Sequence, residues 1–451
     1  MKTVYLENLG CSKNQVDAEV MLTLLQDEFS RTEDPAAADL IIVNTCGFIE
    51  SARAEAIDSF FDLYGSNPEA KIIFSGCMAQ RYADELSAEL TEASAIFGNR
   101  DLSKLPEVVG QVFSGERVVS TPEYPANSFE DVYKRSRLLS FDGSAYVKIS
   151  EGCNHRCSYC AIPIIRGSLR SKPMAIILEE VTSLIARGVK EINLIGQDLA
   201  SWGRDLKEAD AHFMALLKRI VEVEGDFVIR LLYIHPDTFP MELLEFIRNH
   251  PKILPYFDIP FQHAKESILR SMGRRGTKES HLALIQKIRE VLPEAVIRST
   301  ILLGYPGEDE DSFAEVMDFL IQAQLDWVGS FVYSLEEGTK AAELTNERAH
   351  RKLASKARRF QQELEALQLS ITQARLKTFV GRKIDVLIEE HVEGEELYIG
   401  RTYAQAPEVD GLTVVLARDL VPGTVVRCGI TRVNGIDFEA VPLYGGYDGS
   451  H

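Results

Sequence analysis

Short aliphatic runs alternate with amphipathic segments over the first 135 residues of the chain. Three runs are rich in β-branched and aliphatic residues, as buried parallel strands are; they are 3–6, 40–43 and 71–74. The segments 16–29 and 52–64 lie between and after them and have a helical character, and the first repeats apolar residues at helical spacing. This alternation predicts an open parallel α/β sheet.

The same alternation continues through the centre of the chain, from residue 141 to about 335. The candidate strands are 145–149, 191–196, 227–233, 256–261, 296–303 and 327–333. The candidate helices are 175–187, 211–223, 240–249, 278–291 and 310–324. Six strand–helix units predict a partial (β/α)6 parallel barrel rather than a complete eightfold barrel.

The pattern changes twice in the last hundred residues. Apolar residues between 347 and 377 recur at steps of three and four, which predicts one long helix packed against the barrel. Beyond it, short alternating runs separated by Gly, Pro and acidic turns predict a small antiparallel β-barrel. These runs are 384–388, 397–400, 413–416 and 425–428.

The chain is therefore predicted to be an α/β protein of three domains, with limits at 1–135, 136–377 and 378–447. The polar stretch from about 120 to 140, with Pro122, Pro125 and Asn127, is typical of a linker between the first two.

Composition narrows the class of protein. The 451 residues carry a formal net charge of −19, which disfavours direct binding of a nucleic-acid backbone. No apolar run reaches membrane-spanning length, and the N-terminus lacks the apolar core of a signal peptide. We therefore expect a cytoplasmic protein without a membrane partner, whose seven cysteines serve as ligands or thiols rather than as disulfides.

Three of these cysteines form a compact motif after the first strand of the central domain. Cys153, Cys157 and Cys160 have the spacing C-x3-C-x2-C, and Tyr159 precedes the last of them. Three thiolates on one loop can hold three irons of a 4Fe–4S cluster, which leaves the fourth iron open to a substrate or cofactor. Zinc, with His155 as an additional ligand, is the alternative. The spacing and the aromatic residue resemble the signature of radical S-adenosylmethionine enzymes, in which the open iron binds S-adenosylmethionine.

Three other cysteines each follow a predicted strand of the first domain. Cys11, Cys46 and Cys77 come after the first, second and third strand, each beside a glycine. Loops at the carboxyl ends of parallel strands converge, so these thiols can meet although they are far apart in sequence. A single cysteine in such a place is more often a small buried apolar residue, but three favour a second iron–sulfur site. Cys428 has no partner nearby and is interpreted as a packing residue.

Polar residues also follow the strands of the central domain, where barrel chemistry is found. They include Gln197, Asp198, His235, Gln262, His263, Gly304, Tyr305, Ser334, Glu336 and Glu337. We interpret Gln197 as a polar contact to S-adenosylmethionine or a structural residue, and the two histidines as structural residues. The turn at Gly304 is structural first, although its backbone could approach a cofactor. The basic group Arg166, Arg170 and Lys172 is either a solvated face or a contact to an anionic group.

Taken together, the chain resembles the methylthiotransferase family, in which the last module is called the TRAM domain. Several stretches are similar to one branch, the ribosomal-protein aspartate methylthiotransferases (RimO type). These stretches are LGCSKNQVDAE, VNTCGFIESA, EGCNHRCSYCAIP, RLLYIHP, DIPFQHA, YSLEEGT and YIGRTYAQAPEVDG. The tRNA-modifying branch (MiaB type) is similar through the first two domains but usually has a basic TRAM domain. Residues 376–451 here contain seven basic and twelve acidic residues, a net charge of −5, which favours a basic protein partner.

The resemblance implies a specific reaction and set of cofactors. A 4Fe–4S cluster on Cys153, Cys157 and Cys160 would generate a 5′-deoxyadenosyl radical from S-adenosylmethionine. The radical would attack the β-carbon of an aspartate in small-subunit ribosomal protein twelve. A second 4Fe–4S cluster, on Cys11, Cys46 and Cys77, would carry the sulfur that is methylated and transferred.

The resemblance also suggests binding residues and partners. We assign contacts with S-adenosylmethionine to Tyr159, Pro163 and Gln197, and we assign no catalytic side-chain base, because radical transfer requires none. An electron donor and a sulfur source complete the expected partners. Two other readings stay open at this point: a tRNA-adenosine methylthiotransferase, and a non-catalytic iron–sulfur or zinc protein.

Overall fold

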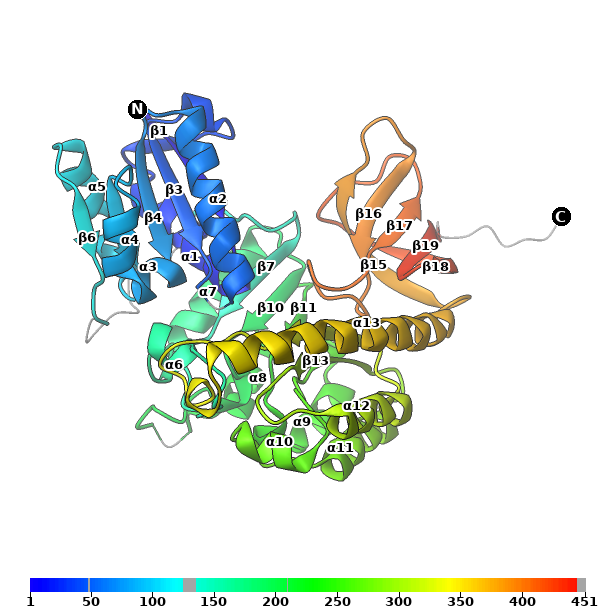
Figure 1. The fold of residues 1–451 in the computed structure, drawn as a ribbon. Helices are drawn as coiled ribbons and strands as arrows, with labels where there is room; N and C mark the ends of the chain where they lie inside the picture. The colour runs from blue at the N-terminus through cyan, green and yellow to red at the C-terminus, as the bar shows by residue number, and fades with distance from the viewer. Residues whose placement is uncertain (48, 125–134, 209, 444–451) are drawn as a thin grey trace. The chain divides into compact units, whose positions relative to one another are not determined.

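The computed structural model describes residues 1–47, 49–124, 135–208 and 210–443 (Figure 1). The chain divides into two compact units. The first contains Met1–Leu139, Tyr146–Arg156 and Cys160–Glu180, and the second contains Ser140–Ala145, Cys157–Tyr159 and Val181–His451. The predicted domain limits stay a prediction, and most of the predicted linker, residues 125–134, lies outside the described residues.

The N-terminal sheet has six strands in the order β2-β1-β3-β4-β5-β6, and every pair is parallel. The strands are β1 (Lys2–Asn8), β2 (Phe29–Arg31), β3 (Leu40–Thr45), β4 (Lys71–Gly76), β5 (Ala95–Gly98) and β6 (Val118–Ser120). The helices are α1 (Ser12–Leu25), α2 (Glu50–Ser66), α3 (Cys77–Arg81), α4 (Ala83–Glu89) and α5 (Leu105–Phe113). The predicted open parallel α/β sheet is therefore confirmed, with three more strands than the sequence indicated.

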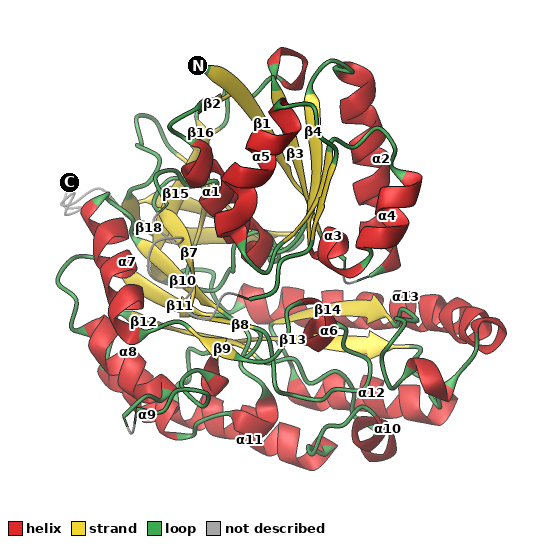
Figure 2. Ribbon diagram, turned by 90° about the vertical axis from the view of Figure 1, so that its left-hand side faces the viewer, coloured by secondary structure: helices red, strands yellow, loops and turns green. Residues whose placement is uncertain are grey.

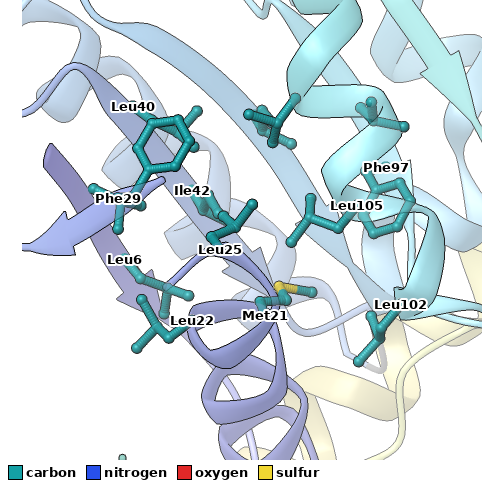
Figure 3. Close-up of a cluster of buried hydrophobic side chains, with 14 of the residues drawn as sticks. Leu6, Met21, Leu22, Leu25, Phe29, Leu40, Ile42, Phe97, Leu102 and Leu105 are labelled. Carbon is teal, nitrogen blue, oxygen red and sulfur yellow. The ribbon is translucent and has the colours of Figure 1, made fainter. Parts of the chain in front are cut away.

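Alternation along the strands explains how helices cover both faces of this sheet. Leu40 and Ile42 pack with residues of α1 and α5, as Figure 3 shows, whereas Ile41 and Val43 pack with residues of α2, α3 and α4. Successive side chains of a strand point to opposite faces, so a wholly apolar strand must be covered twice.

The helix predicted at 16–29 was displaced from its true position. Helix α1 begins at Ser12 and ends at Leu25, while Phe29 belongs to the edge strand β2. The error arose because the first turn of α1 is polar yet buried, so it lacks the apolar stripe that marks a helix.

The central sheet has the six predicted strands in the order β7-β10-β11-β12-β13-β14. They are β7 (Ser144–Lys148), β10 (Glu191–Ile195), β11 (Val228–Leu231), β12 (Ile253–Asp258), β13 (Val296–Leu303) and β14 (Trp327–Val332). The helices are α7 (Met174–Ala186), α8 (Phe213–Val221), α9 (Glu242–Asn249), α10 (Glu266–Ser271), α11 (Lys278–Val291) and α12 (Glu310–Ala323). Figure 2 shows α8, α9, α11 and α12 along one side of this sheet, as in a partial barrel.

Helix α13 (Glu347–Lys377) has the predicted bounds and packs against the central sheet and its helices. The ring of Phe360 stacks on that of Phe313 in α12, with centroids 3.9 Å apart. Near the other end, Thr372 donates a hydrogen bond to the carbonyl oxygen of Asp326 at 2.8 Å. The helix is thus held along its length by one apolar stripe, as its periodicity indicated.

The C-terminal strands close into a five-stranded barrel in the order β15-β16-β17-β19-β18. They are β15 (Lys383–His391), β16 (Leu397–Arg401), β17 (Thr413–Leu416), β18 (Val425–Asn434) and β19 (Asp437–Pro442). The predicted small antiparallel β-barrel is confirmed, with four antiparallel strand pairs and one parallel pair, β17 with β19. A closed ring with an odd number of strands cannot alternate direction throughout, so one parallel pair is required.

The segment 401–410, which begins at the last residue of β16, is bound by all six strands of the central sheet. Each strand contributes one side chain: Ser144, Glu191, Arg230, Tyr256, Arg298 and Trp327. For example, the indole nitrogen of Trp327 donates to the carbonyl oxygen of Ala404 at 2.8 Å, and Arg230 donates to that of Tyr403 at 2.8 Å. Since Ser144, Glu191 and Trp327 are the first residues of their strands, the segment covers the amino-terminal edge of this sheet. The carboxyl-terminal edge is left for chemistry.

Candidate iron–sulfur and S-adenosylmethionine sites

Three adjacent strands bring the N-terminal cysteines to one edge of their sheet. Cys11 follows β1 and caps α1, Cys46 follows β3, and Cys77 begins α3 directly after β4. The sulfur atoms of Cys11 and Cys77 each lie 3.6 Å from Oδ1 of Asn14, so they share one neighbour. The predicted convergence of these loops is therefore seen in the structure, while their role as cluster ligands stays a prediction.

Gly47 allows the loop that carries Cys46 to approach α3. A Cβ atom at Gly47 would lie 2.8 Å from the backbone nitrogen of Met78 and 2.9 Å from the carbonyl carbon of Cys77. Any side chain here would push the loop away from Cys77. The solvent exposure of the three cysteines decreases along the chain, since Cys11 is exposed, Cys46 is intermediate and Cys77 is buried.

Two side-chain donors surround the buried Cys77 sulfur. Asn99 Nδ2 and Arg166 Nη2 each lie 3.3 Å from it. Burial raises the pKa of the Cys77 thiol above its usual value, while the guanidinium of Arg166 acts in the opposite direction. N–H donors aimed at a sulfur are what a thiolate ligand of a cluster requires, so this environment fits an iron–sulfur ligand.

The polar first half of α1 forms a buried charged network that the sequence did not reveal. Asp17 lies 2.9 Å from Arg166 and also pairs with Lys148, while Glu19 lies 2.5 Å from Arg135. All five side chains are almost fully buried. The sequence did contain one signal of this network. A polar run comes immediately after Cys11, where a helix should show its apolar face.

The basic group that follows the second cysteine motif is not a solvated face. Arg166 and Lys172 are buried, and Lys172 lies 2.6 Å from Glu180. Arg170 lies over the ring of Tyr124, 3.2 Å from its centroid. The anionic groups that meet Arg166 and Lys172 are carboxylates of the chain itself.

The loop that carries the second cysteine motif starts from a two-stranded ribbon, β8 (Ser150–Glu151) with β9 (Arg170–Ser171). Gly152 has φ +68°, and a Cβ atom there would lie 2.2 Å from the carbonyl oxygen of Ser168. Cys153 donates its backbone N–H to Gly167, and its sulfur accepts the backbone N–H of His155 at 3.4 Å.

The three thiols of this motif, Cys153, Cys157 and Cys160, are each partly exposed. Within the described ranges, no three His, Cys, Asp or Glu side chains are grouped so as to hold one metal ion. A mononuclear zinc site needs its ligand atoms about 2 Å from a single ion. A cluster instead distributes its thiolates over several irons.

The residues predicted to contact S-adenosylmethionine lie in different surroundings. The hydroxyl of Tyr159 accepts a hydrogen bond from Nη2 of the buried Arg274 at 3.0 Å, and Arg274 also donates to the carbonyl oxygen of Pro260. Pro163 lies in the short helix α6 (Ile162–Ile165). Both amide atoms of Gln197, just after β10, are buried without a hydrogen-bond partner among the described residues. Such an amide is suited to a polar ligand.

Two histidines at the strand ends, which the sequence analysis interpreted as structural residues, take part in hydrogen bonds within the chain. His263 is fully buried, with Nε2 3.2 Å from Glu308 and Nδ1 accepting the N–H of Lys265. His235 accepts the N–H of Asp237 and starts a short 3-10 helix. A Cβ atom at Gly304 would lie 2.8 Å from Cβ of Ala357 in α13, so this turn approaches a helix.

A cleft of about 620 Å³ lies in the second unit, away from these strand ends. Its lining includes Lys190, Phe227, Arg382, Tyr403 and Arg427, at the amino ends of β10 and β11 and on the C-terminal barrel. It is therefore not part of the candidate site. Among the described residues, no helix has the length and apolar character needed to cross a membrane.

Comparison with known proteins agrees with this arrangement. The chain matches the families described as uncharacterized protein family UPF0004 over residues 3–98, Radical SAM superfamily over 147–320, and TRAM domain over 380–443. A solved radical S-adenosylmethionine methyltransferase, TsrM from Kitasatospora setae, has a similar fold, with a TM-score of 0.54 and 18% identity over 73% of this chain and 75% of that one. Fold and cysteine motif together define a radical S-adenosylmethionine enzyme, a class that uses an iron–sulfur cluster and S-adenosylmethionine.

Two relatives narrow the class. The ribosomal protein uS12 methylthiotransferase RimO of Treponema denticola is 40% identical over 96% of this chain and 99% of its own length. The enzyme of the same name from Moorella thermoacetica is 41% identical over 97% of this chain and 98% of its own length. The chain belongs to the RimO family of methylthiotransferases.

Proposed function

We propose that this protein is a radical S-adenosylmethionine methylthiotransferase that modifies ribosomal protein uS12, at the β-carbon of an aspartate. The observation that carries the proposal is that the sulfur atoms of Cys11 and Cys77 each lie 3.6 Å from the same oxygen of Asn14, so the chain holds a second group of thiols besides the radical motif. A simple S-adenosylmethionine cleavage enzyme has no use for a second group of thiols. The full-length similarity to enzymes named for uS12 supports the choice of substrate.

In this proposal the chain holds two 4Fe–4S clusters. Cys153, Cys157 and Cys160 bind one and leave an iron open, and the N-terminal thiols bind the other. When bound, the clusters and S-adenosylmethionine supply a hydrogen-abstracting radical and the methylthio group. The clusters also require an electron donor and a sulfur source, and thiolate ligands favour a reducing, cytoplasmic setting.

The side chains around S-adenosylmethionine would orient the cofactor rather than transfer protons. Arg274 fixes the hydroxyl of Tyr159, and the unpaired amide of Gln197 offers both a donor and an acceptor. Pro163 lies in α6, which begins two residues after Cys160. No side-chain base takes part, because the proposed chemistry moves a hydrogen atom.

A paired assay tests the proposal. Full-length protein, reconstituted anaerobically with iron and sulfide, is incubated with reductant and S-adenosylmethionine. One reaction contains the uS12 loop with the target aspartate and the other contains unmodified tRNA; both are read by mass spectrometry. We expect a methylthio mass gain on the peptide alone. A mass gain on the tRNA alone would refute the proposed substrate. If neither substrate gains mass although the clusters are intact, the proposed activity is refuted.

Single substitutions test the two-cluster assignment in the same assay. Cys11→Ala and Cys77→Ala should abolish methylthiolation but leave iron bound by the radical motif, whereas Cys153→Ala should also abolish S-adenosylmethionine cleavage. Cys428→Ala is the matched control, since this cysteine is buried in β18. Full methylthiolation by Cys77→Ala would contradict the second cluster.

A further inference from the structure

Arg166 lies at the centre of the buried network beneath the N-terminal cysteines. Its Nη2 donates to Sγ of Cys77 at 3.3 Å, to Oδ1 of Asn14 at 3.1 Å and to Oδ2 of Asp17 at 2.9 Å. Its Nη1 donates to both carboxylate oxygens of Glu151, at 2.9 and 3.2 Å. One guanidinium thus connects a candidate ligand of the N-terminal cluster with the ribbon from which the other cysteine loop starts.

The charges around Arg166 are balanced without the sulfur. Asp17 and Glu151 each pair with both Arg166 and Lys148, so two carboxylates meet two cations. Burial alone would raise the pKa of Glu151, but Lys148 and Arg166 lower it from 4.5 to about 2, so the carboxylate stays charged. The bond to Cys77 is therefore an additional contact that the planar, five-donor fork of an arginine can reach.

The backbone around Arg166 is anchored on the domain that carries Cys77. Arg100 donates to the carbonyl oxygens of Ile164 and Ile165, at 2.7 and 3.1 Å. Tyr124 donates to the carbonyl oxygen of Arg166, and the side chain of Ile165 packs against Cys77. The six-residue path from Cys160 to Arg166 is thus held against the N-terminal thiols.

We propose that Arg166 is a positioning residue that sets the reduction potential of the N-terminal cluster through its hydrogen bond to the Cys77 thiolate. This inference rests on the proposed function, in which Cys77 is a cluster ligand. Reduction adds negative charge to a cluster, and a buried cationic donor on a ligand sulfur stabilises that charge. Removal of the donor makes the N-terminal cluster harder to reduce.

The test uses the full-length chain with Cys153, Cys157 and Cys160 changed to alanine, so that only the N-terminal cluster remains. Arg166→Lys keeps the charge but loses the fork, and Arg166→Gln loses both. Iron content and the midpoint potential are measured by redox titration with electron paramagnetic resonance. We expect the potential to shift to more negative values, further in Arg166→Gln than in Arg166→Lys.

Arg100→Gln is the matched control, because Arg100 anchors the same segment through backbone carbonyls and, in the described part of the chain, makes no hydrogen bond to the Cys77 sulfur. Its potential should equal that of the parent. A parent without iron would refute the second cluster, and with it the proposed function. If the parent binds iron and its midpoint potential is unchanged in both Arg166→Lys and Arg100→Gln, the role of Arg166 is refuted while the second cluster stands. Loss of iron from both Arg166 variants, with iron kept by Arg100→Gln, would also overturn the redox role.

Discussion

Replacement of Glu191 by glutamine should loosen the C-terminal barrel from the central sheet. Glu191, the first residue of β10, lies 2.6 Å from Nε of Arg230 and 2.9 Å from Nη2 of Arg401. Its side chain is 4% exposed, and those of the two arginines are 1% and 4% exposed. Removal of this carboxylate leaves Arg230 without an ion-pair partner among the described residues, and leaves Arg401 with Glu389 alone.

The magnitude follows from the pKa of Glu191. Burial alone would raise it, but Arg230 and Arg401 lower it from 4.5 to about 2. At 1.36 kcal/mol per pKa unit, this difference corresponds to about 3 kcal/mol of stability. The same figure is at the low end of the roughly 3–5 kcal/mol lost when one partner of a buried ion pair is removed. Because the folded-state pKa is depressed, this contribution is fully present above pH 4.5 and is lost as the pH falls towards 2.

Trp327 provides the assay, since its indole donates to Ala404 in the segment that Arg401 begins. In a Trp202→Phe background Trp327 is the single tryptophan, because the chain has two. Urea titration of Trp327 fluorescence, with hydrogen exchange of peptides covering 401–410, measures local opening without assuming that the whole chain unfolds in one step. We expect Glu191→Gln to lower the opening free energy by about 3 kcal/mol.

Asp226→Asn is the control for Glu191→Gln. Asp226 pairs with Lys190, the neighbour of Glu191, at 3.0 Å, but its side chain is 93% exposed. Exposed pairs contribute about 0–1 kcal/mol, so this variant should behave like the parent. The reasoning would be refuted if Glu191→Gln changed the opening free energy by no more than Asp226→Asn does.

Three further predictions concern single buried groups. Burial, followed by the charge of Arg274, lowers the pKa of His281 from 6.5 to about 4, so the folded state favours the neutral ring. The free energy of unfolding should therefore fall by about 2 kcal/mol between pH 7 and pH 5. This part of the loss should be absent from His281→Leu in urea titrations, and an identical pH dependence in both proteins would contradict it. Burial raises the pKa of Cys428 to about 11, so its thiol should resist alkylation at pH 8 in the folded protein; rapid labelling would show that β18 opens. Gln197→Leu should weaken S-adenosylmethionine binding about tenfold in calorimetry of the reconstituted protein, whereas an unchanged Kd would remove Gln197 from the site.

Apolar periodicity determined much of this protein before any coordinates. The short apolar runs at 40–43 and 71–74, and the steps of three and four between 347 and 377, required buried strands and one long helix. The position of Cys11, Cys46 and Cys77, each directly after a predicted parallel strand, was enough to place them at one sheet edge, because parallel strands end together. The direction of β19 was settled only by closure of the barrel, in which it lies between β17 and β18 and runs parallel to β17.

Only the tertiary structure decided what the charged residues do. Arg166 could equally have been a solvated residue, and nothing near it in sequence names Asp17 or Cys77 as its neighbours. The segment 401–410 likewise contains no sign that Tyr256 and Arg298 bind Asp410. Apolar residues need only a buried face, which spacing along the chain already specifies. A buried charge needs one particular partner, and that partner is fixed by three-dimensional packing of segments distant in sequence.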